Sequence, residues 1–348
     1  MIRARTVRLW IAVVAAALVA QSLASRTPLR AASPCEWDNI ERIVAVGDVH
    51  GAYDRYIEIL KTAGVIDAGG HWAGGATHFV QLGDVVDRGS DSRKALDFLR
   101  RLEREAQTGG GRAHILLGNH EAARMLGDLR LTVPGEYAAF AKPDSEKLRD
   151  QYLRTLNLAT ASEREQAVQQ MPPGFVEMRQ AFGRDGEYGR WLRQLPVTIK
   201  IDGVMFAHGG ISPAVAPMGC AAINDQVRRE LTSDLDKTRA APMASLTARV
   251  DGPLWYRGLA QEPESFAPQV GEILSALGAR AIVVAHTVAT TSRITARFDG
   301  RVIQIDTGMQ AAYVQGGRAS ALEIHRDEVT AIYVDRRDPV PLPKRPGS

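Results

Sequence analysis

The chain is organised around the stretch Gly83-Asp84-Val85-Val86-Asp87-Arg88-Gly89, which directly follows the apolar run 77–82. An apolar run that ends abruptly in Gly-Asp is typical of a buried strand whose loop carries polar side chains at its carboxyl end. Two carboxylates and one arginine therefore arrive together. Asp84 has the chemistry to bridge metal ions, Asp87 can orient a neighbouring base, and Arg88 offers a planar fork of donors for phosphate oxygens.

Similar blocks stand on both sides of this stretch. Residues 47–51 read Gly-Asp-Val-His-Gly after one apolar run, and residues 118–121 read Gly-Asn-His-Glu after another. Helical patterns at 53–63 and 91–106 alternate with these runs, which predicts a largely parallel sheet with right-handed crossovers. Because ligands bind beyond the carboxyl ends of strands in such sheets, we expect the three blocks to form one site.

The three blocks resemble the GDxHG, GDxxDRG and GNHE signatures of the calcineurin-like metallophosphoesterases, in the form used by the phosphoprotein phosphatase (PPP) family. Three spaced motifs in one order are far more specific than a single glycine-rich string. With later motifs, the resemblance covers about residues 42–310. It implies an α/β fold in which two mixed β-sheets pack as a sandwich and are flanked by helices.

Two later histidines also follow predicted strands. Residues 195–207 read as a hairpin with an Asp-Gly turn that leads to His208, and the apolar run 281–285 leads to His286. A lone histidine at a strand end is more often a structural hydrogen-bonding residue than a ligand. Beside the three earlier motifs, however, these two match the later histidines of the family pattern. The remaining motif-free histidines are interpreted as structural or surface residues: His71, His78, His114 and His325.

The resemblance implies a site for two divalent or trivalent metal ions. Carboxylate, imidazole and amide ligands suit manganese, iron or zinc. Asp84 would bridge the ions, and a hydroxide that they share would attack the phosphorus directly. The other implied ligands are Asp48 and His50 for the first ion, and Asn119, His208 and His286 for the second.

The resemblance also implies roles for residues that bind no metal. His120 would protonate the leaving oxygen, with Asp87 orienting its imidazole. Arg88 would clamp the phosphoryl oxygens. Residues 251–258 resemble a Leu-Trp-containing segment of the bacterial, Shewanella-like PPP branch, in which an arginine reaches the phosphate. Arg257 is therefore expected to be a second clamp, the alternative being a turn whose tryptophan anchors the core.

The chain departs from the eukaryotic PPP pattern in two places. Leu117 stands where that branch usually has arginine before GNHE, and no SAPNY segment follows His286. The late region at 306–309 instead reads Asp-Thr-Gly-Met. The chemistry implied by the resemblance therefore carries over, whereas the inhibitor and substrate preferences of the eukaryotic enzymes do not.

The metallophosphoesterase domain is expected to span residues 42–334. Within it, residues 122–195 predict a helical insertion, which would form either a cap over the site or supporting helices behind the sheet. Apolar runs at 301–307 and 320–334 are expected to complete a second mixed sheet packed on the first. The proline-rich tail, residues 335–348, is expected to be an extended surface arm.

The N-terminus has the order of a secretory signal. Residues 1–24 contain three arginines, then a twelve-residue uncharged apolar core and a small-residue end, with cleavage expected after Ala24. The alternative is an uncleaved anchor, but twelve residues are short for a membrane span. An arm, residues 25–41, would follow. It contains Cys35, which an oxidising compartment would allow to pair with Cys220; the alternative is two unrelated thiols.

The composition narrows the classes of function. Apolar residues make up 45% and charged residues 24% of the chain, an ordinary globular balance. The net charge of +3 comes from the signal segment, because 40 basic and 40 acidic residues remain when its three arginines are removed. No nucleic-acid partner is therefore indicated. No stable membrane span is expected after cleavage, and the oligomeric state is left open.

The leading hypothesis is an exported, periplasmic or secreted, metal-dependent phosphomonoesterase. Its expected substrates are phosphoproteins carrying phosphoserine, phosphothreonine or phosphotyrosine, or small phosphoesters. One alternative is the hydrolysis of nucleotides such as dinucleoside polyphosphates, which similar motifs also support. Another is a phosphate-binding protein that has lost catalysis, which the presence of every expected ligand and of His120 disfavours.

Overall fold

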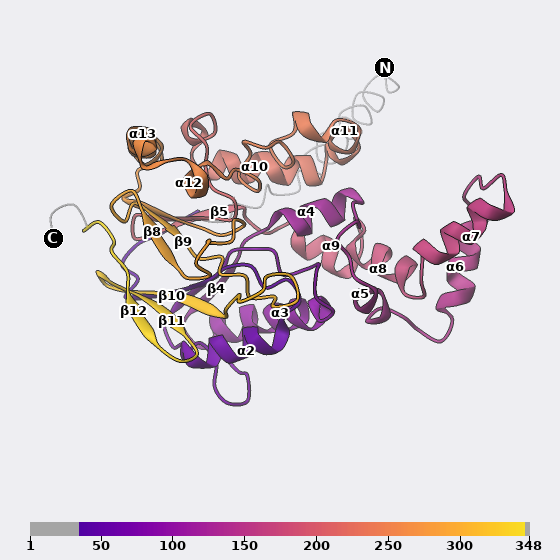
Figure 1. Cartoon of the computed structure of the whole chain (residues 1–348), viewed down its shortest axis with the longest axis horizontal. Coiled ribbons are helices and arrows are strands. Elements are labelled where there is room, and N and C mark those ends of the chain that lie inside the picture. Colours follow the sequence, from indigo (N-terminus) through magenta and orange to yellow (C-terminus); the bar gives the residue numbers. More distant parts are fainter. Residues whose placement is uncertain (1–34, 345–348) are drawn as a thin grey trace, which may run out of the picture. The chain divides into compact units, whose positions relative to one another are not determined.

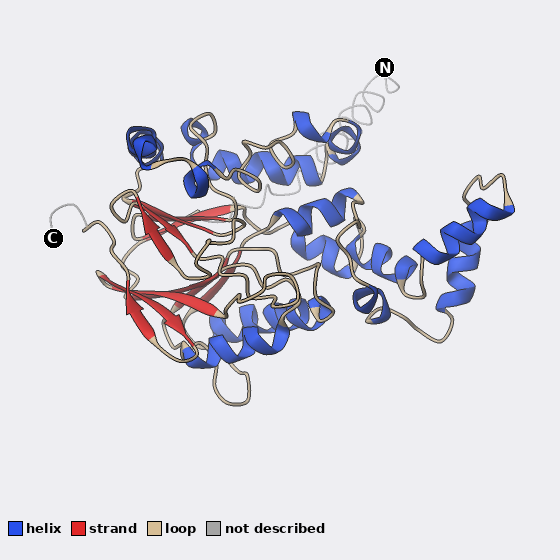
Figure 2. Ribbon diagram, in the orientation of Figure 1, coloured by secondary structure: helices blue, strands red, loops and turns tan. Residues whose placement is uncertain are grey.

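The computed structural model describes residues 35–344. The predicted signal segment 1–24 and the final residues 345–348 lie outside the described part of the chain. The described residues form two six-stranded sheets with helices against their outer faces (Figures 1 and 2). No helix among them is long and apolar enough to cross a membrane.

Sheet I contains the strands that precede the three motif blocks. Its strand order is β12-β11-β10-β2-β3-β4, and β2, β3 and β4 run parallel to one another, as the alternating pattern predicted. Its strands are β2 (Arg42–Val46), β3 (His78–Gln81), β4 (Arg112–Ile115), β10 (Ser320–His325), β11 (Glu328–Tyr333) and β12 (Arg337–Pro339).

Sheet II contains the strands that precede the two later histidines. Its strand order is β1-β5-β6-β7-β9-β8, with β6, β7 and β9 parallel and β5 antiparallel to β6. The predicted hairpin is confirmed, because Asp202 and Gly203 form its turn with φ of 50° and 71°. The strands are β1 (Glu36–Trp37), β5 (Thr198–Ile201), β6 (Val204–Ala207), β7 (Ala281–Val284), β8 (Thr295–Arg297) and β9 (Val302–Gln304).

Alternation along the strands builds the core. In β2, Ile43 and Ala45 face the layer between the two sheets, whereas Val44 and Val46 face the helical layer. Helices α2 (Tyr53–Thr62) and α3 (Ser92–Thr108) cover the outer face of sheet I (Figure 2). Helices α10 (Gly219–Leu231), α12 (Gly258–Gln261) and α13 (Ala267–Leu277) cover sheet II. Apolar burial on every layer thus fixes the sandwich that the resemblance implied.

The remaining helices are short. The first of them, α4, begins at the third motif block, and five follow it within or near the predicted insertion. They are α4 (Asn119–Leu126), α5 (Pro134–Ala138), α6 (Ser145–Arg154), α7 (Ala161–Gln170), α8 (Phe175–Phe182) and α9 (Glu187–Leu192). The other short elements follow β6 in the chain. They are α11 (Leu235–Ala240) and the 3₁₀ turns η1 (Ala216–Met218), η2 (Pro242–Ala244) and η3 (Glu264–Phe266).

The last helix of the insertion, α9, is anchored on α3 beside sheet I. From α9, the Tyr188 hydroxyl donates to Asp97 Oδ1 over 2.6 Å and Trp191 Nε1 donates to Glu103 Oε2 over 2.8 Å, which fixes this helix on α3. Helices α6 and α7 lie farthest from the sheets in Figure 1. The last part of the insertion therefore supports sheet I from its helical side, whereas the first part leads out of the motif block.

One expectation about the last part of the chain is wrong. The closing runs do not complete one sheet, because β9 joins sheet II whereas β10 and β11 form a hairpin in sheet I. The reason is that β10 pairs with the distant strand β2 whereas β9 pairs with β7, and an apolar run alone does not indicate which sheet its strand joins. The expected extended tail begins as the edge strand β12, which pairs antiparallel with β11. Pro339 is compatible with β12 because this is an edge strand.

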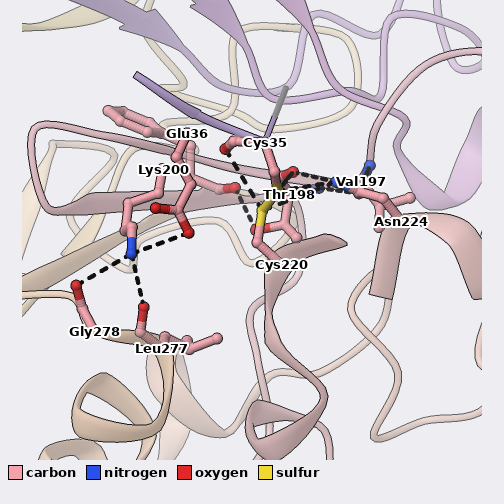
Figure 3. Close-up of a disulfide and its surroundings, with 10 residues drawn as sticks. Cys35, Glu36, Val197, Thr198, Lys200, Cys220, Asn224, Leu277 and Gly278 are labelled. Atoms are coloured by element: carbon pink, nitrogen blue, oxygen red, sulfur yellow. Dashed lines mark hydrogen bonds and ion pairs between the residues drawn. A yellow bond between two sulfur atoms is a disulfide. The ribbon is translucent and has the colours of Figure 1, made fainter. Parts of the chain in front are cut away.

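Of the expected N-terminal arm, residues 25–34 lie outside the described part of the chain, and residues 36–37 join sheet II. Strand β1 pairs parallel with β5, and Cys35, just before β1, forms a disulfide with Cys220 on α10 (Figure 3). Their Cα atoms are 6.2 Å apart across a sequence separation of 185 residues. The open question of the two cysteines is thereby answered in favour of a bridge that ties the arm to the body.

Candidate metal centre and active site

The candidate site lies at the carboxyl ends of the parallel strands of both sheets. These strands are β2, β3 and β4 in sheet I and β6, β7 and β9 in sheet II. The loops after β2, β3 and β4 supply the three motif blocks, and those after β6 and β7 supply His208 and His286. The loop after β9 supplies Asp306. Nine of the ten residues singled out from the sequence thus lie at strand ends, as the strand-end rule predicted, and the tenth, Arg257, lies just before α12.

The site loops are held in strained backbone geometry. Several of their non-glycine residues adopt positive φ, which is uncommon and concentrated at functional sites. They are His50, Asp84, Asp87, Arg88 and His286, with φ between 47° and 69°. Gly83 also has φ of 85°, and a Cβ there would lie 2.3 Å from the backbone nitrogen of Gly118. Glycine is therefore required where the second and third motif blocks touch.

Asp84 lies at the centre of the cluster. Its Oδ2 is 3.3 Å from His208 Nε2 and 3.7 Å from His50 Nε2. Two groups of side chains are close enough to hold a metal ion, and Asp84 belongs to both: one with His50 and His120, the other with His208 and His286. The shared carboxylate has the placement expected of a bridging ligand.

The other two expected ligands complete the cluster. Asp48 Oδ2 lies 3.6 Å from His50 Nε2, and its Oδ1 accepts the backbone N–H of His286 over 3.1 Å. Asn119 Oδ1 lies 2.9 Å from His208 Nε2. All six predicted ligands are buried, so the structure brings them into one water-poor group of nitrogen and oxygen donors.

The imidazoles are oriented by bonds at their outer nitrogens. His50 Nδ1 lies 2.9 Å from the carbonyl oxygen of Val86, and His208 Nδ1 lies 2.7 Å from that of Leu82. Donation to these carbonyls leaves each Nε2 lone pair facing Asp84, which is the arrangement of metal-binding histidines. His286 Nε2 is buried without any hydrogen-bond partner. Such an orphaned nitrogen fits a metal ion as its missing partner.

The buried charges also fit a cation. Burial, together with the charges of Asp306 and Asp84, raises the pKa of Asp48 well above its usual range. Burial likewise raises the pKa of Asp306 to about 6. Burial opposes ionisation of Asp84 as well, but the imidazoles of His208 and His120 hold its pKa well below its usual range. Crowded carboxylates of this kind are stabilised by a bound cation.

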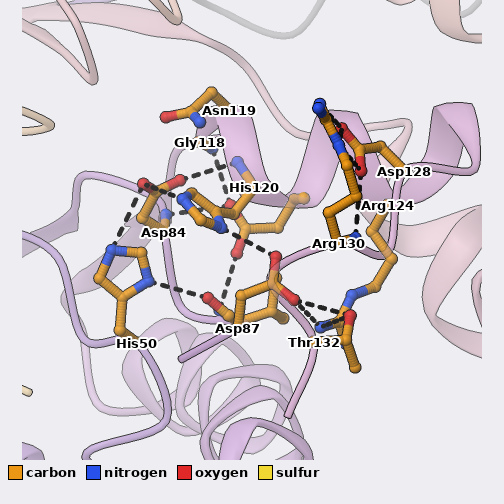
Figure 4. A network of polar contacts seen from close by, with 12 residues as sticks. His50, Asp84, Asp87, Gly118, Asn119, His120, Arg124, Asp128, Arg130 and Thr132 are labelled. Atoms are coloured by element: carbon orange, nitrogen blue, oxygen red, sulfur yellow. Dashed lines mark hydrogen bonds and ion pairs between the residues drawn. The ribbon is translucent and has the colours of Figure 1, made fainter. Parts of the chain in front are cut away.

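His120 and Asp87 form a separate pair at the edge of the ligand cluster (Figure 4). His120 Nδ1 lies 2.8 Å from Asp87 Oδ2, and its Nε2 points toward Asp84 at 3.8 Å. Burial lowers the pKa of His120, but the charge of Asp84 and the hydrogen bond to Asp87 outweigh it and raise that pKa. The pKa is therefore shifted in the direction that a proton donor needs.

The two expected phosphate clamps come from different parts of the chain, Arg88 from the loop after β3 and Arg257 from the start of α12. The Arg88 guanidinium stacks 3.6 Å from the ring centroid of Tyr313, and its Nε is buried without a partner. Arg257 Nη1 donates to the carbonyl oxygen of His286 over 3.1 Å and to Thr287 Oγ1 over 2.9 Å. Arg257 is thus placed beside an expected metal ligand.

Sequence reasoning missed three contributors to the site. Asp306 hydrogen-bonds Asp48; it follows the apolar run of β9, which is the signal that had identified the other strand ends. Glu121 binds the site loop, because its carboxylate accepts the backbone N–H groups of Asp84, Val85 and Val86. Arg124 bonds Asp87 from α4, and nothing in the local sequence indicated this contact.

Comparison with known proteins agrees with this geometry. Residues 41–289 match the family model described as calcineurin-like phosphoesterase. The chain belongs to this family. The match spans all three motif blocks and both later histidines, so the predicted fold and the predicted resemblance are confirmed.

Individual relatives share most of their length with this calcineurin-like phosphoesterase. The uncharacterized protein C1840.07c of Schizosaccharomyces pombe is 30% identical over 296 residues, which cover 83% of this chain and 79% of that protein. Shewanella-like protein phosphatase 2 of Arabidopsis thaliana is 29% identical over 302 residues, with 82% and 76% covered. A solved cold-active protein-tyrosine phosphatase of a psychrophilic Shewanella species matches with a TM-score of 0.69 at 27% identity, over 88% of this chain and 82% of that one.

Proposed function

We propose that this calcineurin-like phosphoesterase is a metal-dependent phosphomonoesterase that hydrolyses phosphoproteins. The proposal rests mainly on one observation. The carboxylate of Asp84, which both candidate metal groups share, lies close to the hydrogen-bonded Asp87–His120 pair. Two arginines, Arg88 and Arg257, lie beside the same cluster. The relatives named as protein phosphatases and as a protein-tyrosine phosphatase favour a phosphoprotein substrate.

The residues fit two metal ions. His50, Asp48 and Asp84 would hold the first, and Asp84 would be shared with a second. The further ligands of the second ion would be Asn119, His208 and His286. When bound, manganese, iron or zinc at such a site would supply charge neutralisation and activate water near neutral pH.

The protein's own side chains then have distinct tasks. Arg88 and Arg257 are expected to bind phosphoryl oxygens, since a dianionic phosphate needs several positive donors. His120 gives a proton to the leaving oxygen of the substrate. Asp87 holds the imidazole with Nδ1 engaged over 2.8 Å, so that the opposite nitrogen faces the reaction.

A substrate panel tests the proposed function. The purified protein, loaded equally with each metal, is given a phosphotyrosine peptide, a phosphoserine peptide, p-nitrophenyl phosphate and a dinucleoside polyphosphate. We expect the highest kcat/KM on a phosphopeptide. A clear preference for the dinucleoside polyphosphate would transfer the assignment to nucleotide hydrolysis, and phosphate binding without turnover of any substrate would indicate an inactive binding protein.

We further propose that the chain is exported and that its mature form begins near Ser25. The support is the signal pattern of residues 1–24 together with the Cys35–Cys220 bridge, because disulfides persist in oxidising compartments. Mass spectrometry of the protein from cell fractions tests this. An intact N-terminal methionine in a cytoplasmic fraction would contradict it.

A further inference from the structure

Asp87 is bonded on both of its carboxylate oxygens. Its Oδ2 faces His120, while its Oδ1 accepts hydrogen bonds from Arg124 Nη2 and, over 3.0 Å, from Thr132 Oγ1 (Figure 4). The Arg124 side chain is only 1% exposed. The residue that orients the proton donor is therefore itself held by a buried cation from α4.

Glu136, from α5 of the insertion, completes this network. Arg124 Nη2 lies 3.0 Å from both carboxylate oxygens of Glu136, whose side chain is also 1% exposed. Glu136 Oε1 also accepts the backbone N–H of Asp87 over 3.1 Å. Asp87 is thus fixed through its side chain by Arg124 and through its backbone by Glu136.

The segment around Glu136 follows the motif loop closely. The backbone N–H of Arg88 donates to the carbonyl oxygen of Leu131 over 3.2 Å, next to the Thr132 contact. Asp87 and Arg88 both have positive φ, so their backbone depends on such contacts to hold an uncommon conformation. Residues 131–136 of the insertion therefore pack against the loop that carries the second motif block.

Arg124 is held in turn by the later helix α8. Its Nη1 lies 3.8 Å from Met178 Sδ, and its guanidinium carbon lies 4.9 Å from the ring centroid of Phe182. The network contains two carboxylates and one guanidinium, all buried. Removing Arg124 would leave Asp87 and Glu136 as neighbouring buried carboxylates without the cation between them, and such removal strongly disturbs buried ion pairs.

We propose that Arg124 and Glu136 are positioning residues through which the helical insertion orients the Asp87–His120 pair for proton donation. The insertion then supports the Asp87–His120 pair directly, and is neither a cap over the site nor only a support behind the sheet. This inference rests on the proposed function, because it concerns the donor of that reaction. It assigns no metal or phosphate contact to either residue.

The test compares leaving groups in the metal-loaded full chain. Arg124→Gln removes the cation, and Glu136→Gln removes one charge at nearly constant shape. Turnover of an alkyl phosphate needs a proton donor, whereas p-nitrophenyl phosphate scarcely does. In both variants we expect the alkyl phosphate to lose about 10- to 100-fold more in kcat than p-nitrophenyl phosphate, the scale on which supporting-shell residues act.

Arg193→Gln is the matched control. Arg193 is also a buried arginine of the insertion, but it donates to the carbonyl oxygens of Leu231 over 2.8 Å and of Gly189 over 2.9 Å, away from the site. It should lower the unfolding temperature and leave the ratio between the two substrates unchanged. Metal content and inhibition by inorganic phosphate should stay at wild-type values in all three variants, because Arg88 and Arg257 are intact.

Equal losses on both substrates in Arg124→Gln and Glu136→Gln, as in Arg193→Gln, would overturn the inference and leave the proposed function standing. Loss of metal or of phosphate inhibition in Glu136→Gln would also overturn it, because the residue would then support another part of the site. A wild-type protein that hydrolyses neither of these substrates nor a phosphopeptide would overturn both claims. The outcomes therefore separate the inference from the function on which it rests.

Discussion

Two groups of buried histidines differ in their surroundings within the described part of the chain. One group, His50, His120, His208 and His286, lies at the carboxyl ends of strands among aspartates. The other consists of His78 and His114 within β3 and β4. His114 Nε2 lies 3.0 Å from His78 Nδ1, and the Trp37 ring packs 4.4 Å from His114.

The pKa shifts separate only part of the strand-end group from the other pair, because burial lowers the pKa of His50 to about 4 and also lowers that of His286. Burial, together with the charge of Arg112, lowers the pKa of His78 to about 4, and burial and the neighbouring imidazole lower that of His114. Although burial also acts on His120 and His208, the charge of Asp84 raises both of their pKa values. The charge of Asp84 therefore sets His120 and His208 apart from His78 and His114 in the direction of their pKa shifts.

Loss of the proton donor should give the largest effect at the strand-end group. His120→Asn is expected to reduce turnover of an alkyl phosphate by about 10²- to 10⁴-fold. The loss on p-nitrophenyl phosphate should be much smaller, because that leaving group hardly needs protonation. Steady-state kinetics on both substrates, with metal content checked, provide the measurement. Equal losses with intact metal would show that His120 serves positioning or metal support instead.

Arg88→Ala should reduce turnover somewhat less than His120→Asn, and by a similar factor for good and poor leaving groups. It removes a positive donor from the phosphoryl group itself, so we expect a loss of about 10²- to 10³-fold in kcat on both substrates. The same kinetic comparison measures it. A loss confined to the alkyl phosphate would show that Arg88 supports proton donation by His120 and does not bind the phosphoryl group.

The N-terminal bridge should affect stability and leave chemistry unchanged. Reduction of Cys35–Cys220 frees β1, which carries Trp37 against His114. Disulfides typically contribute about 2–4 kcal/mol, so the free energy of unfolding should fall on that scale. Denaturant unfolding of oxidised and reduced protein measures the change. A matching fall in kcat under native conditions would contradict the separation of the two histidine groups.

His114→Gln should have the smallest effect. It disrupts a buried hydrogen bond and is expected to cost about 1–3 kcal/mol in stability. Turnover and metal content should remain at wild-type values, because no expected metal ligand contacts this pair. Thermal unfolding and kinetics of the variant check both statements. A loss of metal in His114→Gln would remove the distinction drawn between the two groups.

Much of the site could be predicted from the sequence because each strand-end block carries its chemistry in a few consecutive residues. The parallel strands then bring Asp48, Asp84 and Asn119 together with little further information. Asp306 was missed although it follows the apolar run of β9, whereas two other missed residues depend on tertiary contacts. Arg124 and Glu136 reach Asp87 only after the insertion has folded back, and no local pattern marks them.

The predictions about the fold that were confirmed depend on local sequence, and the one that was wrong depends on long-range pairing. The Asp202-Gly203 hairpin was predicted because its turn chemistry is local. The assignment of β9 and β10 to different sheets was missed because strand pairing is a long-range property that apolar runs do not encode. The Cys35–Cys220 pairing stayed open until the backbone placed the two Cα atoms 6.2 Å apart.

The central claim is that Asp84 joins two metal positions at the strand-end group. Elemental analysis of metal per chain, on wild type, Asp84→Asn and His114→Gln, tests it most directly. We expect two ions in the wild type and in His114→Gln, and impaired binding of both ions with loss of turnover in Asp84→Asn. Two tightly held ions unchanged in Asp84→Asn would contradict the bridging role and the account built on it.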